Sequence, residues 1–464
     1  MFKIEDIVNK IHCADCLEFI RNIPDKSIDA IVTDPPAGIS FMGQEWDTFD
    51  KSMFGKKGEE GENDLKVKKN FEVLPRYGNA DLLGFQDFIC AVFTEAIRVL
   101  KPGGHTLVWA IPRTSHHTAM GLERAGFDIR DCVYHIFGSG FPKSHNVALG
   151  IDKKTGYKKN RGHAIASGSK YHPTTGLARA SGELLPDYKG HTPEAKQWEG
   201  WGTALKPAVE CWWLCRKPLS EKTVAENVLK WGTGGLNIDG CRVEYTDDNK
   251  PIPQLAQGKT EIKTDKGMYG GNSYNESKTK SVIGGSLQGR FPANLIHDGS
   301  DEVMAGFPNT GGGHWSYKQK KGQGVLKLGL NNLSDKGTDK EIASAARFFY
   351  CAKASRSERD AGLEGVEAKR IEGRDEGQDE RNVPYKSRTT PQRNQHPTVK
   401  PLALMRYLIK LITPPNGIVL DMFAGSGSTL VACRDLGIRF IGIEIEPKYV
   451  SIANKRLSQE VLPL

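Results

Sequence analysis

The distribution of apolar residues predicts alternating strands and helices over the first 140 residues. Short apolar runs bounded by glycine, proline or charged residues indicate strands, and apolar residues at three- and four-residue spacing indicate helices. The predicted strands are 10–13, 28–33, 105–111 and 128–137, and the predicted helices are 17–23, 85–100 and 115–125. Such alternation is typical of a doubly wound α/β sheet.

The same rhythm returns at the C-terminal end after a long interruption. One apolar segment, 209–216, predicts a strand that returns to the sheet from within polar sequence. The later predicted elements are helix 401–411, strand 417–420, helix 428–436 and strand 440–445. We therefore expect one α/β core built from both ends of the chain, with large polar insertions between them.

Composition and charge are those of a globular protein with a mild basic surplus. The 464 residues are 38% hydrophobic and carry a net charge of +8, which permits a polyanionic partner. The nine scattered cysteines, without a secretory leader, favour reduced thiols in the cytoplasm. Cys13 and Cys16 have CxxC spacing, but no second pair follows, so we expect no metal. No apolar run reaches the roughly 20 residues of a membrane span.

A loop of small residues follows the predicted strand 417–420 and leads into a helix. Such a turn lets the backbone approach a ligand at a helix N-terminus, and Glu444 at the end of the next strand suits two ribose hydroxyls. The candidate residues of this loop are Asp421, Phe423, Gly425, Gly427, Ser428 and Thr429. A tight turn with a surface glutamate is the alternative. A P-loop is excluded because no Gly-Lys-Ser/Thr ending is present.

A second candidate site is the segment Asp34-Pro35-Pro36-Ala37, directly after the buried strand 28–33. Ligands of α/β sheets bind at the carboxyl ends of the strands, and the two prolines stiffen this loop. A rigid end of a strand with a capping aspartate is the alternative explanation.

Four motifs in this order resemble those of beta-class amino-group DNA methyltransferases, of the phage-borne or restriction–modification type. They are Asp34-Pro35-Pro36, HPTVKP at 396–401, Phe423-x-Gly425-x-Gly427 and FIGIEIEPKY at 440–449. The resemblance implies a Rossmann-like methyltransferase sheet with permuted motif order, S-adenosylmethionine as cofactor, double-stranded DNA as partner and no metal. It divides the chain into a catalytic half (1–145), a basic insertion (146–202), a returning core strand (203–222), a target-recognition region (223–390) and a cofactor half (391–464).

The resemblance also implies roles for the residues of the catalytic segment and of the cofactor site. Asp34 and the Pro35 carbonyl would accept hydrogen bonds from the target amino group, which leaves the nitrogen lone pair aimed at the methyl donor. The cofactor contacts fall into three groups: Phe423, Gly425 and Gly427 at the methionine part, with Thr398 and Lys400 closing over it; Glu444 at the ribose; and Asp15 and Cys16 at the adenine ring.

One position departs from the family pattern. An aromatic residue usually follows Asp-Pro-Pro and stacks on the flipped base, whereas this chain has Ala37. We expect another ring to replace it, and the candidates are Phe41, Trp46 and Trp109. The alternative is a weakened or inactive DNA-binding relative.

The insertions combine basic residues with aromatic ones, which suits contact with phosphates and opening of the base stack. A charge run is more often only an exposed surface. The residues concerned are Lys153, Lys154, Lys158, Lys159, Lys318, Lys320, Lys321, Arg356 and Arg359, with Tyr171, Trp198, Trp201, Trp315 and Tyr317. We predict an adenine N6 methyltransferase, with cytosine N4 as the alternative; a homodimer and a restriction endonuclease partner are both compatible with the sequence.

Overall fold

The computed structural model describes residues 1–39, 76–77, 80–138, 140, 144–156, 188–245, 288–310, 343–352, 356–368 and 393–459. Nine strands form one sheet in the order β1-β13-β12-β2-β5-β7-β6-β8-β11. The sheet is parallel except for β7, which is antiparallel to both of its neighbours. The predicted doubly wound α/β fold is confirmed.

The strands of the main sheet are β1 (Lys10–Cys13), β2 (Ile28–Thr33), β5 (Leu100–Ala110), β6 (Asp128–Ile136), β7 (Val209–Arg216), β8 (Leu295–His297), β11 (Tyr350–Cys351), β12 (Ile418–Asp421) and β13 (Arg439–Glu444). Two small two-stranded sheets pair β3 (Arg76–Tyr77) with β4 (Ala80–Asp81) and β9 (Asn309–Thr310) with β10 (Ala343–Ser344). The larger helices are α3 (Leu82–Val99), α4 (Ser115–Arg124), α5 (Val147–Lys154), α7 (Val224–Trp231), α11 (Leu402–Ile412), α12 (Ser428–Asp435) and α13 (Pro447–Leu457). The shorter helices are α1 (Ile4–Ile7), α2 (Cys16–Ile20), α6 (Pro193–Lys196), α9 (Asp301–Gly306), α10 (Arg356–Asp360), η4 (Asp239–Cys241) and η6 (Ala345–Phe348).

The two ends of the chain interleave in the centre of the sheet. The N-terminal strand β2 pairs with the C-terminal strand β12, and β1 pairs with β13. From β12 the chain winds toward one edge, and from β2 it winds toward the other. The boundary between β2 and β12 is therefore the topological switch point, where open α/β sheets bind their ligands.

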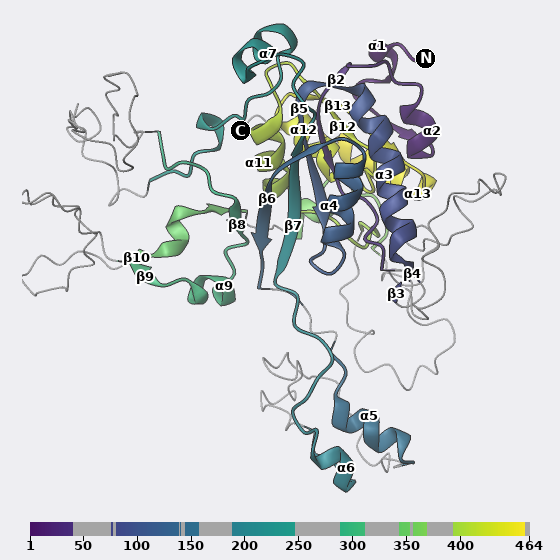
Figure 1. The fold of residues 1–464 in the computed structure, drawn as a ribbon, viewed down its shortest axis with the longest axis vertical. Coiled ribbons are helices and arrows are strands. Elements are labelled where there is room, and N and C mark those ends of the chain that lie inside the picture. Colours follow the sequence, from purple (N-terminus) through teal and green to yellow (C-terminus); the bar gives the residue numbers. More distant parts are fainter. Residues whose placement is uncertain are drawn as a thin grey trace, which may run out of the picture.

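Helices cover both faces of this sheet and form two apolar cores (Figure 1). Alternate side chains of β2 point to opposite faces: Ile31 packs with α2, α3 and α4, whereas Ala30 and Val32 pack with α11 and α12. Every residue of β2 is buried. A strand covered on both faces is largely apolar, as in IDAIVT, and its two buried polar residues have partners: Asp29 pairs with Lys101 and accepts from the Ile418 N–H, and Thr33 donates to Asp421.

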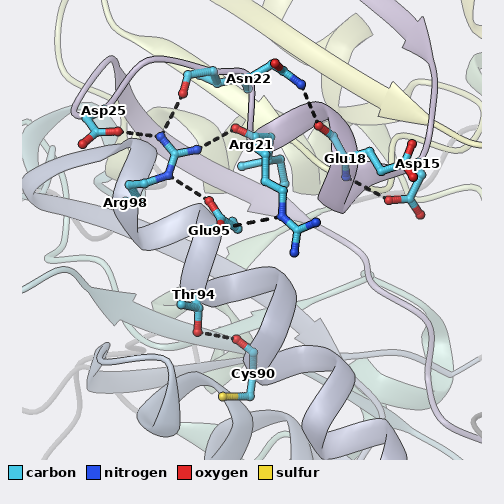
Figure 2. A network of polar contacts seen from close by, with 11 residues as sticks. Asp15, Glu18, Arg21, Asn22, Asp25, Cys90, Thr94, Glu95 and Arg98 are labelled. Carbon is cyan, nitrogen blue, oxygen red and sulfur yellow. Dashed lines mark hydrogen bonds and ion pairs between the residues drawn. The ribbon is translucent and has the colours of Figure 1, made fainter. Parts of the chain in front are cut away.

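A cluster of polar contacts fixes α2 against the C-terminal end of α3 (Figure 2). The Arg98 guanidinium donates to the carbonyls of Ile20 and Ile23 and pairs with Glu95 and Asp25. These carbonyls lie at and after the end of α2, where a helix leaves acceptors without internal partners. The contacts hold the turn that precedes β2, the strand that leads into Asp34-Pro35-Pro36.

Most predicted elements are present with ends that differ by a few residues, but β5 differs more. We expected this strand to begin at residue 105 after a Pro-Gly-Gly stop, whereas β5 begins at Leu100. Its register against β2 shifts, because Ile28 pairs with Leu100 and Ala30 pairs with His105. The extra residues form a bulge, which is how a strand accommodates residues that do not fit a regular ladder.

The regions predicted as insertions contain ordered elements that were not expected from the sequence. Within 223–390, β8 and β11 extend the main sheet and α7 packs near β5. Within 146–202, α5 and α6 stand apart from the sheet at the end of the two segments that leave β6 and enter β7 (Figure 1). Among the helices that the structure describes, none combines the length and apolar character needed to cross a bilayer.

Candidate functional site

A pocket of about 1270 Å³ opens at the switch point of the sheet. It is lined by the segments that follow β1, β2, β5, β12 and β13, by the segment that precedes β7, and by residues between His396 and Lys400. Pockets for one drug-sized ligand are commonly about 300–1000 Å³. This pocket therefore has room for a nucleotide-sized cofactor together with part of a second molecule.

Asp34 lies in the pocket at the carboxyl end of β2, paired with a lysine from the far end of the chain. Its Oδ2 is 2.9 Å from Nζ of Lys400, and only 21% of the Asp34 side chain is exposed. Burial raises the pKa of Asp34, and the nearby Lys400 ammonium opposes that rise. Lys400 also lies over the Trp109 ring, with Nζ 3.8 Å from the ring centroid. The lysine thus helps to keep this carboxyl group ionised inside the pocket.

Glu210 is a pocket residue that the sequence analysis did not identify. It stands near the start of β7, which runs antiparallel and so places its N-terminal end beside the carboxyl ends of the other strands. Burial would raise the pKa of Glu210, but Lys400, His135 and Trp109 outweigh that effect and lower it to about 2. Lys400 therefore acts electrostatically on two carboxylates, Asp34 and Glu210. A lone acid in the apolar run VECWWLCR was the available sequence signal.

The predicted glycine loop also lines the pocket, and a backbone group of this loop bonds to Glu444. The Gly425 N–H donates to Oε2 of Glu444 and the Glu446 N–H donates to Oε1, each at 2.8 Å. Burial raises the pKa of Glu444, and these backbone donors oppose the rise. Each carboxylate oxygen has two acceptor positions, so Glu444 retains capacity for the hydroxyls of a ligand.

Gly425 and Gly427 are both required by the backbone, but they face different neighbours. Gly425 has φ +52°, lines the pocket, and a Cβ there would lie 2.7 Å from Nε2 of His396. Gly427 has φ +80°, and its Cβ would lie 2.9 Å from Cβ of Ala453 in α13. Gly427 was expected to leave space for the ligand; it does not line the pocket, and instead allows α12 to pack against α13.

Asp421 links the two strands at the switch point. It is buried, accepts a hydrogen bond from Thr33 Oγ1 at 2.7 Å and another from the Phe423 N–H at 3.1 Å. Burial raises its pKa to about 6, against these hydrogen bonds. Ser428 and Thr429 line the pocket at the start of α12. Asp421 thus fixes the loop that follows it as well as bordering the pocket.

Asp15 and Cys16 also line the pocket, at the start of α2. Asp15 caps this helix by accepting from the Glu18 N–H at 3.0 Å. The Cys16 thiol is buried, which raises its pKa to about 12, whereas Cys13 is exposed. A thiol with so high a pKa stays protonated at neutral pH, so Cys16 is a small apolar wall residue rather than a nucleophile.

Of the ring candidates for stacking on a base, Trp109 lines the pocket and Phe41 and Trp46 lie outside the described residues. One face of Trp109 is covered by the Lys400 ammonium. Ala37 also borders the pocket, and its carbonyl accepts from Thr114 Oγ1 at 2.7 Å. That another ring replaces the aromatic residue usually found after Asp-Pro-Pro therefore stays a prediction.

The basic and aromatic residues of the insertions are only partly described. Lys153 and Lys154 occupy the last turn of α5, and Trp198 and Trp201 form an edge-to-face pair with centroids 5.1 Å apart. Arg359 was expected at a phosphate, but it donates to the His396 carbonyl at 3.0 Å, which supports the HPTVKP segment. For Arg356 the structure describes the backbone alone. The remaining predicted residues lie outside the described ranges: Lys158, Lys159, Tyr171, Trp315, Tyr317, Lys318, Lys320 and Lys321.

Comparisons with known proteins agree with this geometry. The family model N6_N4_Mtase, described as DNA methylase, matches residues 28–455. The type II methyltransferase M2.DpnII of Streptococcus pneumoniae is 47% identical over 66 residues, which is 14% of this chain and 25% of that protein. M.HindIII of Haemophilus influenzae is 46% identical over 72 residues, or 16% of this chain and 23% of that protein. The chain thus matches these curated relatives over about a quarter of their length.

A solved structure, the PvuII DNA methyltransferase (cytosine-N4-specific), covers 98% of this chain and 87% of its own, with 13% identity and a TM-score of 0.39. The family model covers most of the sequence, from β2 to α13, and so includes both the Asp34 segment and the glycine loop. The chain therefore belongs to the N6/N4 amino-group DNA methylase family, whose cofactor is S-adenosylmethionine.

Proposed function

We propose that the protein transfers a methyl group from S-adenosylmethionine to the exocyclic amino group of a base in double-stranded DNA, with adenine N6 as the favoured acceptor. The observation that carries this proposal is the position of Asp34 in the same pocket as the glycine loop and Glu444. The pocket thus brings together a carboxylate that can bind an amino group and a loop that can bind a nucleotide, and it is large enough for the cofactor and the target base.

The residues present fit the cofactor. Gly425 lies against the His396 ring and has no side chain, so the loop backbone can approach a ligand there. Glu444 would accept the ribose hydroxyls, Asp15 and Cys16 would border the adenine ring, and Thr398 and Phe423 would enclose the methionine part. When bound, S-adenosylmethionine supplies an electrophilic methyl group carried on a sulfonium.

Asp34 would act on the amino group of the target base. Its carboxylate and the Pro35 carbonyl would accept hydrogen bonds from the amino group, which directs the nitrogen lone pair toward the methyl group. The nitrogen would bond to the methyl group as the methyl–sulfur bond breaks, and the proton that the nitrogen then loses would pass to the Asp34 carboxylate. Fixing this geometry supplies much of the rate, because both reactants are held in place beforehand. The incoming amino group takes the place that Lys400 Nζ holds at Asp34 Oδ2. The base must leave the helical stack to reach the pocket.

Adenine is favoured over cytosine because family members with Asp-Pro-Pro more often methylate adenine, and those with Ser-Pro-Pro more often methylate cytosine N4. Cytosine N4 is the alternative acceptor. A homodimer and a restriction endonuclease partner stay predictions.

A labelled-methyl assay tests the proposal. Purified protein is incubated with unmethylated plasmid DNA and methyl-labelled S-adenosylmethionine, and the DNA is digested to nucleosides and resolved by mass. We expect label in N6-methyldeoxyadenosine; label in N4-methyldeoxycytidine would show the alternative acceptor. No DNA label above that of the Asp34→Ala variant, with cofactor binding intact, would contradict methyl transfer altogether.

A further inference from the structure

Residues 203–208 line the pocket and include an unusually exposed leucine. Leu205 is 93% exposed and lines the same pocket as Asp34. A single exposed apolar residue is common on protein surfaces and needs no explanation by itself. Three features distinguish Leu205 from such a residue: its position beside the pocket, the anchoring of its segment and the charge around it.

The segment is anchored on both sides of Leu205. On one side, Ser144 Oγ accepts from the N–H groups of Thr203 and Ala204, at 2.9 and 3.3 Å. On the other side, the Phe137 N–H donates to the Ala208 carbonyl at 3.0 Å, directly before β7 begins. Leu205 is therefore held out into solvent at a fixed place, which differs from an apolar residue at the tip of a free loop.

The surroundings of Leu205 suit a polyanion. Residues 201–208 read WGTALKPA, with Lys206 next to the leucine and no acidic residue. Arg113 also lines this pocket, after β5. The segment connects the sheet to the α5–α6 unit, which projects from the body and carries Lys153 and Lys154 (Figure 1). Duplex DNA lying across the pocket rim would meet these cations with its phosphates.

We propose that Leu205 inserts into the base stack of duplex DNA and fills the gap left by the target base when that base enters the pocket. Leucine is one of the apolar side chains that proteins use to separate base steps. The inference rests on the proposed function, since a flipped base is needed only if the chemistry occurs in this pocket. Leu205 would then be a positioning residue and would take no part in methyl transfer itself.

The test compares Leu205→Ala with a conservative variant, Leu205→Met, and a matched control, Leu229→Ala. Leu229 lies in α7, is 88% exposed and does not line the pocket. Substrates are duplexes that carry the site mapped by long-read sequencing of DNA from expressing cells. Each duplex is prepared with the target base paired and with an abasic position opposite it.

On the paired duplex, Leu205→Ala should slow single-turnover transfer about tenfold or more, because no side chain would then occupy the gap that the flipped base leaves in the stack. On the abasic duplex, where less pairing opposes flipping, the variant should come within about threefold of wild type. Leu205→Met and Leu229→Ala should both behave as wild type, and calorimetry should show unchanged S-adenosylmethionine affinity for all variants.

The possible failures are distinct. If wild-type protein methylates no DNA, the proposed function is wrong. If wild type is active and Leu205→Ala matches it on the paired duplex, only the insertion is wrong. Equal losses on paired and abasic duplexes, or weakened cofactor affinity, would assign Leu205 to general DNA contact or to the cofactor site and would also overturn the insertion.

Discussion

Asp34 directly follows β2 and Glu444 ends β13, the two strands that flank β12, yet the two acids are held in different ways. Glu444 accepts from the backbone N–H groups of Gly425 and Glu446, which cannot leave without unfolding the loop. Asp34 pairs with another side chain, the ammonium group of Lys400. The first arrangement suits a fixed receptor for a cofactor, and the second suits a carboxylate that exchanges its partner for a substrate amino group. We therefore propose cofactor binding as the role of Glu444 and chemistry as the role of Asp34.

Removing Asp34 should have the largest effect on activity. Asp34→Ala deletes the acceptor for the amino group, and a loss of roughly 10²–10³-fold in kcat is expected for a group that acts mainly in the transition state. Asp34→Asn keeps one acceptor oxygen without the charge and should fall between this variant and wild type. Single-turnover transfer to the mapped duplex measures both. Near-wild-type turnover of Asp34→Ala would remove it from the mechanism.

Removing Glu444 should affect cofactor affinity rather than turnover at saturation. Glu444→Ala loses the ribose acceptor and leaves the Gly425 and Glu446 N–H groups without their partner. We expect S-adenosylmethionine to bind about 10- to 100-fold more weakly, from a loss of roughly 1–3 kcal/mol. Calorimetry gives the affinity, and thermal unfolding reports whether the loop itself has been lost. An unchanged affinity would show that Glu444 only supports the loop.

Removing Lys400 should change the pH dependence. Burial raises the pKa of Asp34 and Lys400 opposes that rise, while Glu210 adds to it. Lys400→Met should therefore raise this pKa further. Because the carboxylate is the active form, activity would be lost at a higher pH as the solution is acidified. The acid limb of the kcat/KM profile measures the shift. If the midpoint of the acid limb stays at the same pH or moves to lower pH, Lys400 does not lower the pKa of Asp34.

The smallest expected effect is on stability, from substitution of Gly427, which follows β12, and of Gly437, which follows α12. Gly437 has φ +65° with no atom within 4 Å of an added Cβ, whereas a Cβ on Gly427 would overlap Ala453. Gly437→Ala should cost about 1–2 kcal/mol of unfolding free energy from the left-handed backbone alone. Gly427→Ala should cost at least about 1 kcal/mol more from overpacking. Denaturant unfolding measures both, and equal costs would show that α13 moves aside freely.

The sequence predicted those parts of the fold in which local pattern and tertiary environment agree. The strand 28–33 was placed correctly because a strand buried on both faces reads as a largely apolar run. The bulge in β5 was missed because Pro102 and Gly103 look like a stop, and only the pairing with β2 shows that the strand continues through them.

The parts of the site that escaped prediction depend on contacts between distant residues. Glu210 gains its low pKa partly from Lys400, which lies far away in the chain. Gly427 was assigned to the ligand because α13 and its Ala453 were not predicted. Arg359 reads as a surface cation until its hydrogen bond to His396 is known. Each role is set by the fold and leaves little trace in the local sequence.

The most direct test measures two quantities on the same preparations of Asp34→Ala and Glu444→Ala: the S-adenosylmethionine dissociation constant and the single-turnover rate at saturating cofactor. The predicted result is a crossed pattern. Asp34→Ala binds cofactor within about twofold of wild type and loses transfer, whereas Glu444→Ala loses affinity and recovers most of its rate when the cofactor is saturating. If both variants lose both quantities together, the separation of binding from chemistry between these two acids is contradicted.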